Sequence, residues 1–96
     1  MKVRISAAAE HDLENIADWI ARDHPKRAYR YFLALRRAAL EIGKNPRVFS
    51  LAPGLEDLGY RRRVYGQHLI FFVIAEDTVE VVRILHGAQD RSVLDD

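Results

Sequence analysis

Three consecutive arginines, Arg61, Arg62 and Arg63, form the most concentrated group of like charges in the chain. The alternating pattern around them is typical of a strand, so Arg61 and Arg63 should point to one face of a sheet and Arg62 to the other. Guanidinium groups bind phosphate and carboxylate through paired hydrogen bonds. The arginine pair is therefore a candidate anion-binding site, although an exposed strand that carries solubilising charge would show the same pattern.

A second candidate site lies at the predicted end of the last strand, in the sequence RILHGAQD that begins at Arg83. Arg83 and His86 would lie at the sheet edge beside a glycine bend, where a phosphate group or a protein loop can reach them. If the strand registers match, Arg83 adds a further guanidinium to the arginine triplet. The alternative is that His86 and Asp90 hydrogen-bond to each other and to the local backbone, and so seal the chain end.

The chain lacks the residues and motifs that several other common chemistries need. The chain has no cysteine, which excludes thiol catalysis, a disulfide scaffold and cysteine-based zinc sites. The serines lie in no nucleophile-elbow motif, and no glycine-rich phosphate loop is present. The histidines lack the spacing of a helix-borne metal pair, so we expect neither a metal site nor a cofactor. The four histidines are His11, His24, His68 and His86.

The charge is distributed unevenly along the chain. The formal net charge is +1, but residues 22 to 63 contain 11 basic and 4 acidic side chains, a local excess of +7. Such polarity favours an acidic partner surface, either nucleic acid or an acidic protein segment. A scattered set of charges on a solvated face is the alternative.

Length and composition indicate one folded domain over residues 1–96. A chain of 96 residues with 49% hydrophobic and 30% charged side chains has the composition of a globular protein with a single core. No signal core precedes the domain, and the longest apolar run, Leu69–Ala75, is far shorter than the roughly 20 residues that span a bilayer. We therefore expect a cytoplasmic protein without membrane contact.

The first half of the chain predicts a strand followed by two helices. Alternation around Val3 and Ile5 indicates a short strand, and helical spacing indicates a first helix over 7–22 with Ser6 as its N-cap. Pro25 ends that helix and begins a second one, which we expect over 26–44. Two adjacent helices of this kind should form a hairpin.

The second helix carries an unusually wide apolar arc of roughly 200°. Such an arc predicts contact with both the first helix and the sheet. Arg36 falls inside it, so its charge must reach solvent or pair with a carboxylate of the first helix. The arc contains Tyr29, Tyr31, Phe32, Leu33, Leu35, Ala39, Leu40 and Ile42.

The second half of the chain predicts a loop over 47–58 and then three strands, over 60–65, 68–75 and 78–85. The short turns between these strands make them antiparallel neighbours, and the middle strand, apolar on both faces, should be central. The order is β-α-α-β-β-β. We thus expect an α+β fold, with the helical hairpin packed on one face of a mainly antiparallel four-stranded sheet.

With these elements in place, the chain resembles the ParE branch of the ParE/RelE superfamily, the toxin halves of bacterial toxin-antitoxin pairs. The resemblance covers almost the whole length. It rests on the opening VRISAAAEHDLENIADWI, the D-H-P break, the segment RRRVYGQHLIFFVI and above all VVRILHGAQD at the end of the last strand. It implies the fold described above.

The resemblance also implies a partner and a target. The partner is a small ParD-like antitoxin, and the target of ParE-like toxins is DNA gyrase, which they inhibit by binding and not by catalysis. DNA would be contacted only through the antitoxin or gyrase. In this interpretation Arg61, Arg63, Arg83 and His86 bind the target. The expected antitoxin-binding residues are Tyr29, Phe32, Arg36, Arg62, Tyr65, Leu69 and Phe71.

Two alternatives stay open beside gyrase inhibition. RelE-like relatives cleave messenger RNA on the ribosome, and Arg61, Arg63, Arg83 and His86 would then be the catalytic candidates. These nucleases commonly have a tyrosine soon after the last strand, whereas the residues from Gly87 to Val93 include none. The other alternative is an inactive or differently targeted member.

Overall fold

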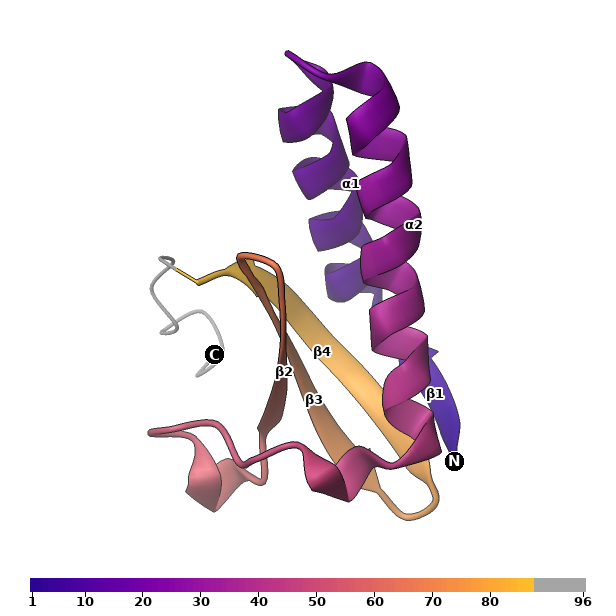
Figure 1. Ribbon diagram of the computed structural model, residues 1–96. Helices are drawn as coiled ribbons and strands as arrows, with labels where there is room; N and C mark the ends of the chain where they lie inside the picture. The colour runs from indigo at the N-terminus through magenta and orange to yellow at the C-terminus, as the bar shows by residue number, and fades with distance from the viewer. Residues whose placement is uncertain (88–96) are drawn as a thin grey trace.

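The fold has the predicted order of one strand, two helices and three strands. In the computed structural model, which describes residues 1–87, β1 (Lys2–Ile5) leads into α1 (Ala7–Ala21) and α2 (Pro25–Glu41). Three short 3₁₀ turns then connect to β2 (Arg61–Tyr65), β3 (His68–Ala75) and β4 (Thr78–His86). Figure 1 shows the helical hairpin on one face of the sheet, with its tip extending beyond the sheet end. The predicted α+β architecture is confirmed.

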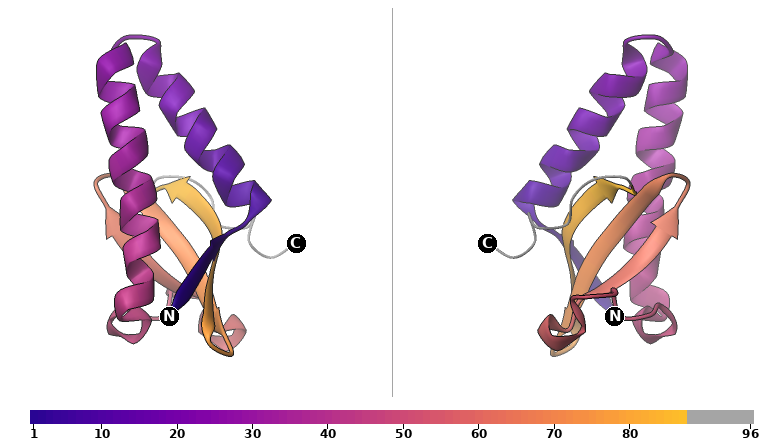
Figure 2. Two further views of the ribbon diagram at one scale, coloured as in Figure 1. Left: turned by 90° about the vertical axis from the view of Figure 1, so that its right-hand side faces the viewer. Right: turned by 90° about the vertical axis from the view of Figure 1, so that its left-hand side faces the viewer.

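The sheet is mixed, with strand order β1-β4-β3-β2. The β2–β3 and β3–β4 pairs are antiparallel, as their short turns require, and β1 is parallel to β4 because the whole helical hairpin separates the two strands in the chain. β3 and β4 each have two neighbours, so the apolar middle strand is central, as predicted. Figure 2 shows the sheet curving beneath the two helices.

The helix boundaries follow local signals. Ser6 caps α1 by accepting a hydrogen bond from the Ala9 N–H at 3.0 Å, and Pro25 occupies the first turn of α2, as predicted. α2 ends earlier than expected, at Glu41, and a 3₁₀ turn follows over Ile42–Lys44. Within this turn Gly43 packs against the start of the chain, where an added Cβ would lie 2.3 Å from the Met1 carbonyl oxygen.

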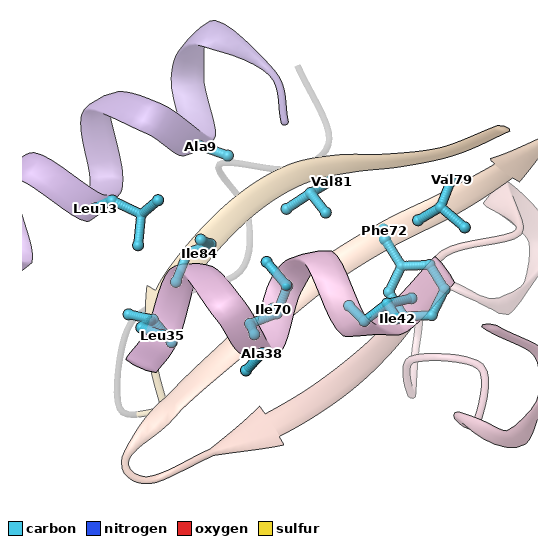
Figure 3. Close-up of a cluster of buried hydrophobic side chains, with 11 residues drawn as sticks. Ala9, Leu13, Leu35, Ala38, Ile42, Ile70, Phe72, Val79, Val81 and Ile84 are labelled. Carbon is cyan, nitrogen blue, oxygen red and sulfur yellow. The ribbon is translucent and has the colours of Figure 1, made fainter. Parts of the chain in front are cut away.

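Two hydrophobic clusters lie on opposite faces of the sheet. The larger one joins the helices to β3 and β4, and Figure 3 shows side chains of both helices, among them Leu13 and Leu35, together with Ile70 and Phe72 of β3. The smaller one lies on the far face, where Ala52 and Leu55 of the loop before β2 pack over the sheet. The remaining members of the smaller cluster are Leu69, Phe71 and Leu85. Both faces of the central strands are therefore buried.

The wide apolar arc predicted for α2 is only half buried. Leu35, Ala39 and Ile42 are completely buried, whereas Tyr29, Leu33 and Leu40 are exposed on the outer side of the helix. The predicted contact of α2 with both the first helix and the sheet is confirmed, but both lie on its inner side, so no segment of residues 1–87 covers the outer part of the arc. Between the two halves lies Arg36, which forms an ion pair with Glu10 of α1, so the predicted partner on the first helix is confirmed.

Within residues 1–87, no helix is long and apolar enough to cross a membrane.

Candidate functional site

Arg61 and Arg63 share the sheet face that carries the helices, as their alternation predicted. The Arg61 guanidinium donates a hydrogen bond to the Phe49 carbonyl oxygen at 2.7 Å. The Arg63 guanidinium donates to the Ala38 carbonyl oxygen at 2.9 Å and lies 5.5 Å from the centre of the Phe49 ring. Both side chains thus tie β2 to α2 and to the segment that follows it, and much of their donor capacity is used within the fold.

Arg83 was expected to add a fourth guanidinium to the triplet if the strand registers matched, but its side chain does not join Arg61 and Arg63. Arg83 is opposite Phe71, which is opposite Arg62, so its strand position matches Arg62 and not Arg61 or Arg63. Its guanidinium instead donates two hydrogen bonds to the Asp12 carboxylate of α1, at 2.8 and 2.9 Å. These hydrogen bonds raise the pKa of Arg83.

His86 is the exposed member of the predicted target-binding set. It ends β4 opposite His68, and the two imidazole rings meet edge to face with centroids 5.5 Å apart. His86 Nε2 lies 3.3 Å from the Gln67 side-chain oxygen in the β2–β3 turn. The alternative pairing of His86 with Asp90 lies outside the described residues. Arg61, Arg63, Arg83 and His86 therefore do not converge on one catalytic centre.

Beside His86, the structure reveals a tyrosine–histidine contact that sequence analysis missed. Tyr31 Oη and His68 Nδ1 share a hydrogen bond of 2.7 Å. Burial raises the pKa of Tyr31, and the neighbouring Tyr65 raises it further. Burial also lowers the pKa of His68, and His86 acts in the same direction. No local pattern marks this contact, because the two residues are 37 positions apart and Tyr31 was assigned only to the apolar arc.

The tyrosine hydroxyl also fixes the turn between β2 and β3. Gly66 adopts a positive φ of 57°, and an added Cβ there would lie 2.8 Å from Tyr31 Oη. Glycine at this position both permits the left-handed turn and leaves room for the hydroxyl. The turn, α2 and the end of β4 are therefore held as one unit.

This unit borders an open hollow of about 850 Å³ between the helix tip and the sheet end. Its walls come from α1 and α2, and its floor comes from the β2–β3 turn and the strand ends. Trp19, the only tryptophan of the chain, lines it and is 68% exposed. Other lining residues are Ile16, Asp23, His24, Arg27, Tyr31, Gln67, His68 and His86.

The His68 environment predicts a pH-dependent stability. A histidine whose pKa is lower in the folded than in the unfolded chain binds fewer protons when folded, so acid favours unfolding. The free energy of unfolding should thus decline as the pH falls below 6.5, the ordinary value for His68. In thermal unfolding between pH 7.5 and pH 5, the His68→Gln variant should lose less stability than the unmodified protein. The same pH dependence in His68→Gln and in the unmodified protein would show that His68 does not cause this decline.

No group of three histidine or carboxylate side chains within residues 1–87 is arranged to hold a metal ion.

The predicted antitoxin-binding residues have different environments. Tyr29 is exposed on the outer side of α2, and Phe32, Arg62 and Tyr65 are partly exposed. Leu69 and Phe71 were expected to contact a partner, but they are buried beneath the loop that precedes β2. They therefore offer no surface to a partner in this structure. The sequence did not reveal the smaller hydrophobic cluster that buries them.

Comparison with known proteins gives consistent results. The family described as the ParE toxin of the type II toxin-antitoxin system parDE matches residues 3–91. Toxin ParE1 of Mycobacterium tuberculosis is 34% identical over 88 residues, which cover 90% of this chain and 89% of that protein.

Solved structures share the fold at lower sequence identity. A chain of the chromosomal ParDE toxin-antitoxin system from P. aeruginosa superposes with a TM-score of 0.77 at 17% identity, covering 90% of this chain and 95% of that one. A chain of the RelBE2 toxin-antitoxin complex from Mycobacterium tuberculosis gives a TM-score of 0.66 at 21% identity, covering 88% and 95%.

Proposed function

The chain belongs to the ParE toxin family of type II toxin-antitoxin systems, and from this premise we propose that it inhibits DNA gyrase and is neutralised by a ParD-like antitoxin. The observation that carries the proposal is the family match over residues 3–91, nearly the whole chain. In this function the toxin acts by binding, within the bacterial cytoplasm, and blocks replication. It requires no cofactor.

The outer side of α2 is the surface that best suits an antitoxin. Tyr29, Leu33 and Leu40 form an exposed apolar stripe along it, and the basic side chains Arg30 and Arg37 lie beside this stripe. An acidic amphipathic segment of the antitoxin would cover the apolar side chains and pair with the arginines, as in coupled folding and binding. Of the residues predicted from the sequence, Tyr29, Phe32 and Arg36 belong to α2 and stay in this surface, whereas Arg62 and Tyr65 belong to β2 and stay in the proposal as contacts beyond it.

For gyrase, the proposed contact is centred on His86 at the end of β4. Arg83 lies near the same end of β4 and is held by Asp12, whereas Arg61 and Arg63 lie further along the sheet and contact Phe49 and Ala38. The same contacts weigh against the messenger RNA nuclease alternative. Three of its four catalytic candidates, the arginines, donate hydrogen bonds within the fold. Their guanidinium groups contact different segments and do not face a common phosphate position.

His86→Ala tests this contact directly. Removing an exposed side chain at the centre of an interface should raise the concentration needed for half-maximal inhibition of gyrase supercoiling by about tenfold. His11→Ala, which removes an exposed histidine of α1, is the matched control and should inhibit like the unmodified protein. Equal inhibition by His86→Ala and the unmodified protein would contradict a role for His86 in target binding.

A further inference from the structure

The hollow beneath the helix tip has the chemistry of a nucleotide site. We propose that it binds single-stranded nucleic acid, with one base against Trp19 and the adjoining phosphates on Arg27 and its basic neighbours. This function goes beyond gyrase inhibition and does not depend on which protein the toxin targets, although His86 borders both surfaces.

The volume and lining of the hollow suit one nucleotide. At about 850 Å³ it falls in the range of small-molecule sites, and it combines apolar walls with a few convergent polar groups. Trp19 offers a planar ring, and the Arg22 guanidinium lies over that ring at 5.0 Å from its centre. Bases of single strands stack on aromatic rings and on guanidinium planes, irrespective of sequence.

The polar groups around the ring favour an anion. Arg27 projects from α2 into the same hollow, and His86 lies at the opposite side on the sheet end. Tyr31 holds the neighbouring His68 through its 2.7 Å hydrogen bond, which fixes the floor of the hollow. Asp23, the acidic side chain among the lining residues, offsets the charge of Arg27. The positive excess therefore comes from the adjoining Lys26 and Arg30 and from Arg22 over the Trp19 ring.

An exposed basic surface beside the hollow argues for a strand in place of a free nucleotide. It shares Asp23, His24 and Arg27 with the hollow and adds the exposed side chains of Lys26 and Arg30. A chain that leaves the hollow past Arg27 would therefore place its next phosphate near two more cations. Duplex DNA lacks exposed base faces, so the stacking surface selects single strands.

Fluorescence of Trp19 gives a direct test, because it is the chain's only tryptophan. The purified full chain is titrated with octauridylate and octathymidylate, which separate RNA from DNA as the source, and with adenosine monophosphate. We expect quenching by at least one octamer and weaker binding of the mononucleotide. With about two phosphates engaged, affinity for the octamer should fall about sevenfold between roughly 50 and 200 mM salt.

Variants locate the site by anisotropy of a labelled octamer. Trp19→Ala should weaken binding about tenfold, and Arg27→Ala should weaken it about fivefold with a shallower salt dependence. Val48→Ala and Arg47→Ala are the matched controls, since both side chains are exposed beyond the opposite end of α2. The proposal is overturned by the absence of binding at low salt, by equal losses in the controls, or by equally tight binding of polyglutamate or duplex DNA. Neither gyrase nor antitoxin is present, so the result is independent of both.

Discussion

Asp12→Ala should lower the free energy of unfolding by about 2–3 kcal/mol, because it removes a buried carboxylate that accepts three hydrogen bonds, two of them from a partly buried guanidinium. The Asp12 carboxylate accepts two hydrogen bonds from Arg83 and a third from the Ile84 backbone N–H at 2.9 Å. The substitution leaves the Arg83 guanidinium and the Ile84 backbone N–H without this acceptor. Since folded domains are stable by only about 5–15 kcal/mol, a large part of the total would be lost.

Chemical denaturation measures this loss. Glu14→Ala removes an exposed carboxylate from the same helix and should change the free energy of unfolding by less than about 0.5 kcal/mol. Asp12→Ala combined with Arg83→Met should be more stable than Asp12→Ala alone, because the unpaired charge is then removed as well. Similar stabilities of Asp12→Ala and Glu14→Ala would show that the ion pair contributes little.

Phe72→Ala is expected to have an effect of similar size, about 3–5 kcal/mol, for a different reason. Phe72 is completely buried in the larger cluster, and its ring meets that of Phe49 edge to face with centroids 6.0 Å apart. Truncation leaves a cavity and also removes the aromatic contact that holds the segment after α2. Arg61 and Arg63, which both contact Phe49, would lose part of their support.

Phe72→Leu provides the comparison for the second prediction. Because leucine retains most of the apolar volume, it should cost less than half of the loss seen for Phe72→Ala in the same denaturation experiment. Equal losses for the two variants would indicate that the ring contact, and not the cavity, dominates. A loss below about 1 kcal/mol for Phe72→Ala would contradict the central position of this side chain.

The elements that local signals specify were predictable from the sequence. Alternation around Val3 and Ile5 marked β1, Pro25 marked the start of α2, and the Gly66-Gln67 pair marked the turn between β2 and β3. The partner of Arg36 was also predictable in kind, because consecutive helices joined by a short break must lie side by side. Each of these features depends on residues that are close in the chain or on neighbouring elements.

The candidate site was less predictable because it depends on contacts between distant segments. Asp12 and Arg83 are 71 positions apart, and their contact follows from how α1 packs on β4. Arg61 donates to the Phe49 carbonyl, and Arg63 donates to the Ala38 carbonyl and forms an ion pair with Glu41 at 3.5 Å; no local residue pattern identifies these partners. Two arginines on one strand face therefore suggested an anion site, whereas the fold uses them for internal hydrogen bonds.

The exposed half of α2 shows a similar limit. An apolar arc indicates which side chains favour burial, but not whether a second layer of the same chain exists to cover them. Tyr29, Leu33 and Leu40 have no such layer within the described residues. This is consistent with a surface that a partner covers, which periodicity alone does not distinguish from a core.

The central claim, that this toxin acts on gyrase, is tested most directly by two assays on one preparation of the purified chain freed from antitoxin. The first measures ATP-dependent supercoiling of relaxed plasmid by gyrase, and the second measures cleavage of messenger RNA on translating ribosomes. We predict loss of supercoiling, with accumulation of cleaved plasmid, while the messenger RNA stays intact. Cleaved messenger RNA together with normal supercoiling would contradict the account and would return Arg61, Arg63, Arg83 and His86 to consideration as catalytic residues.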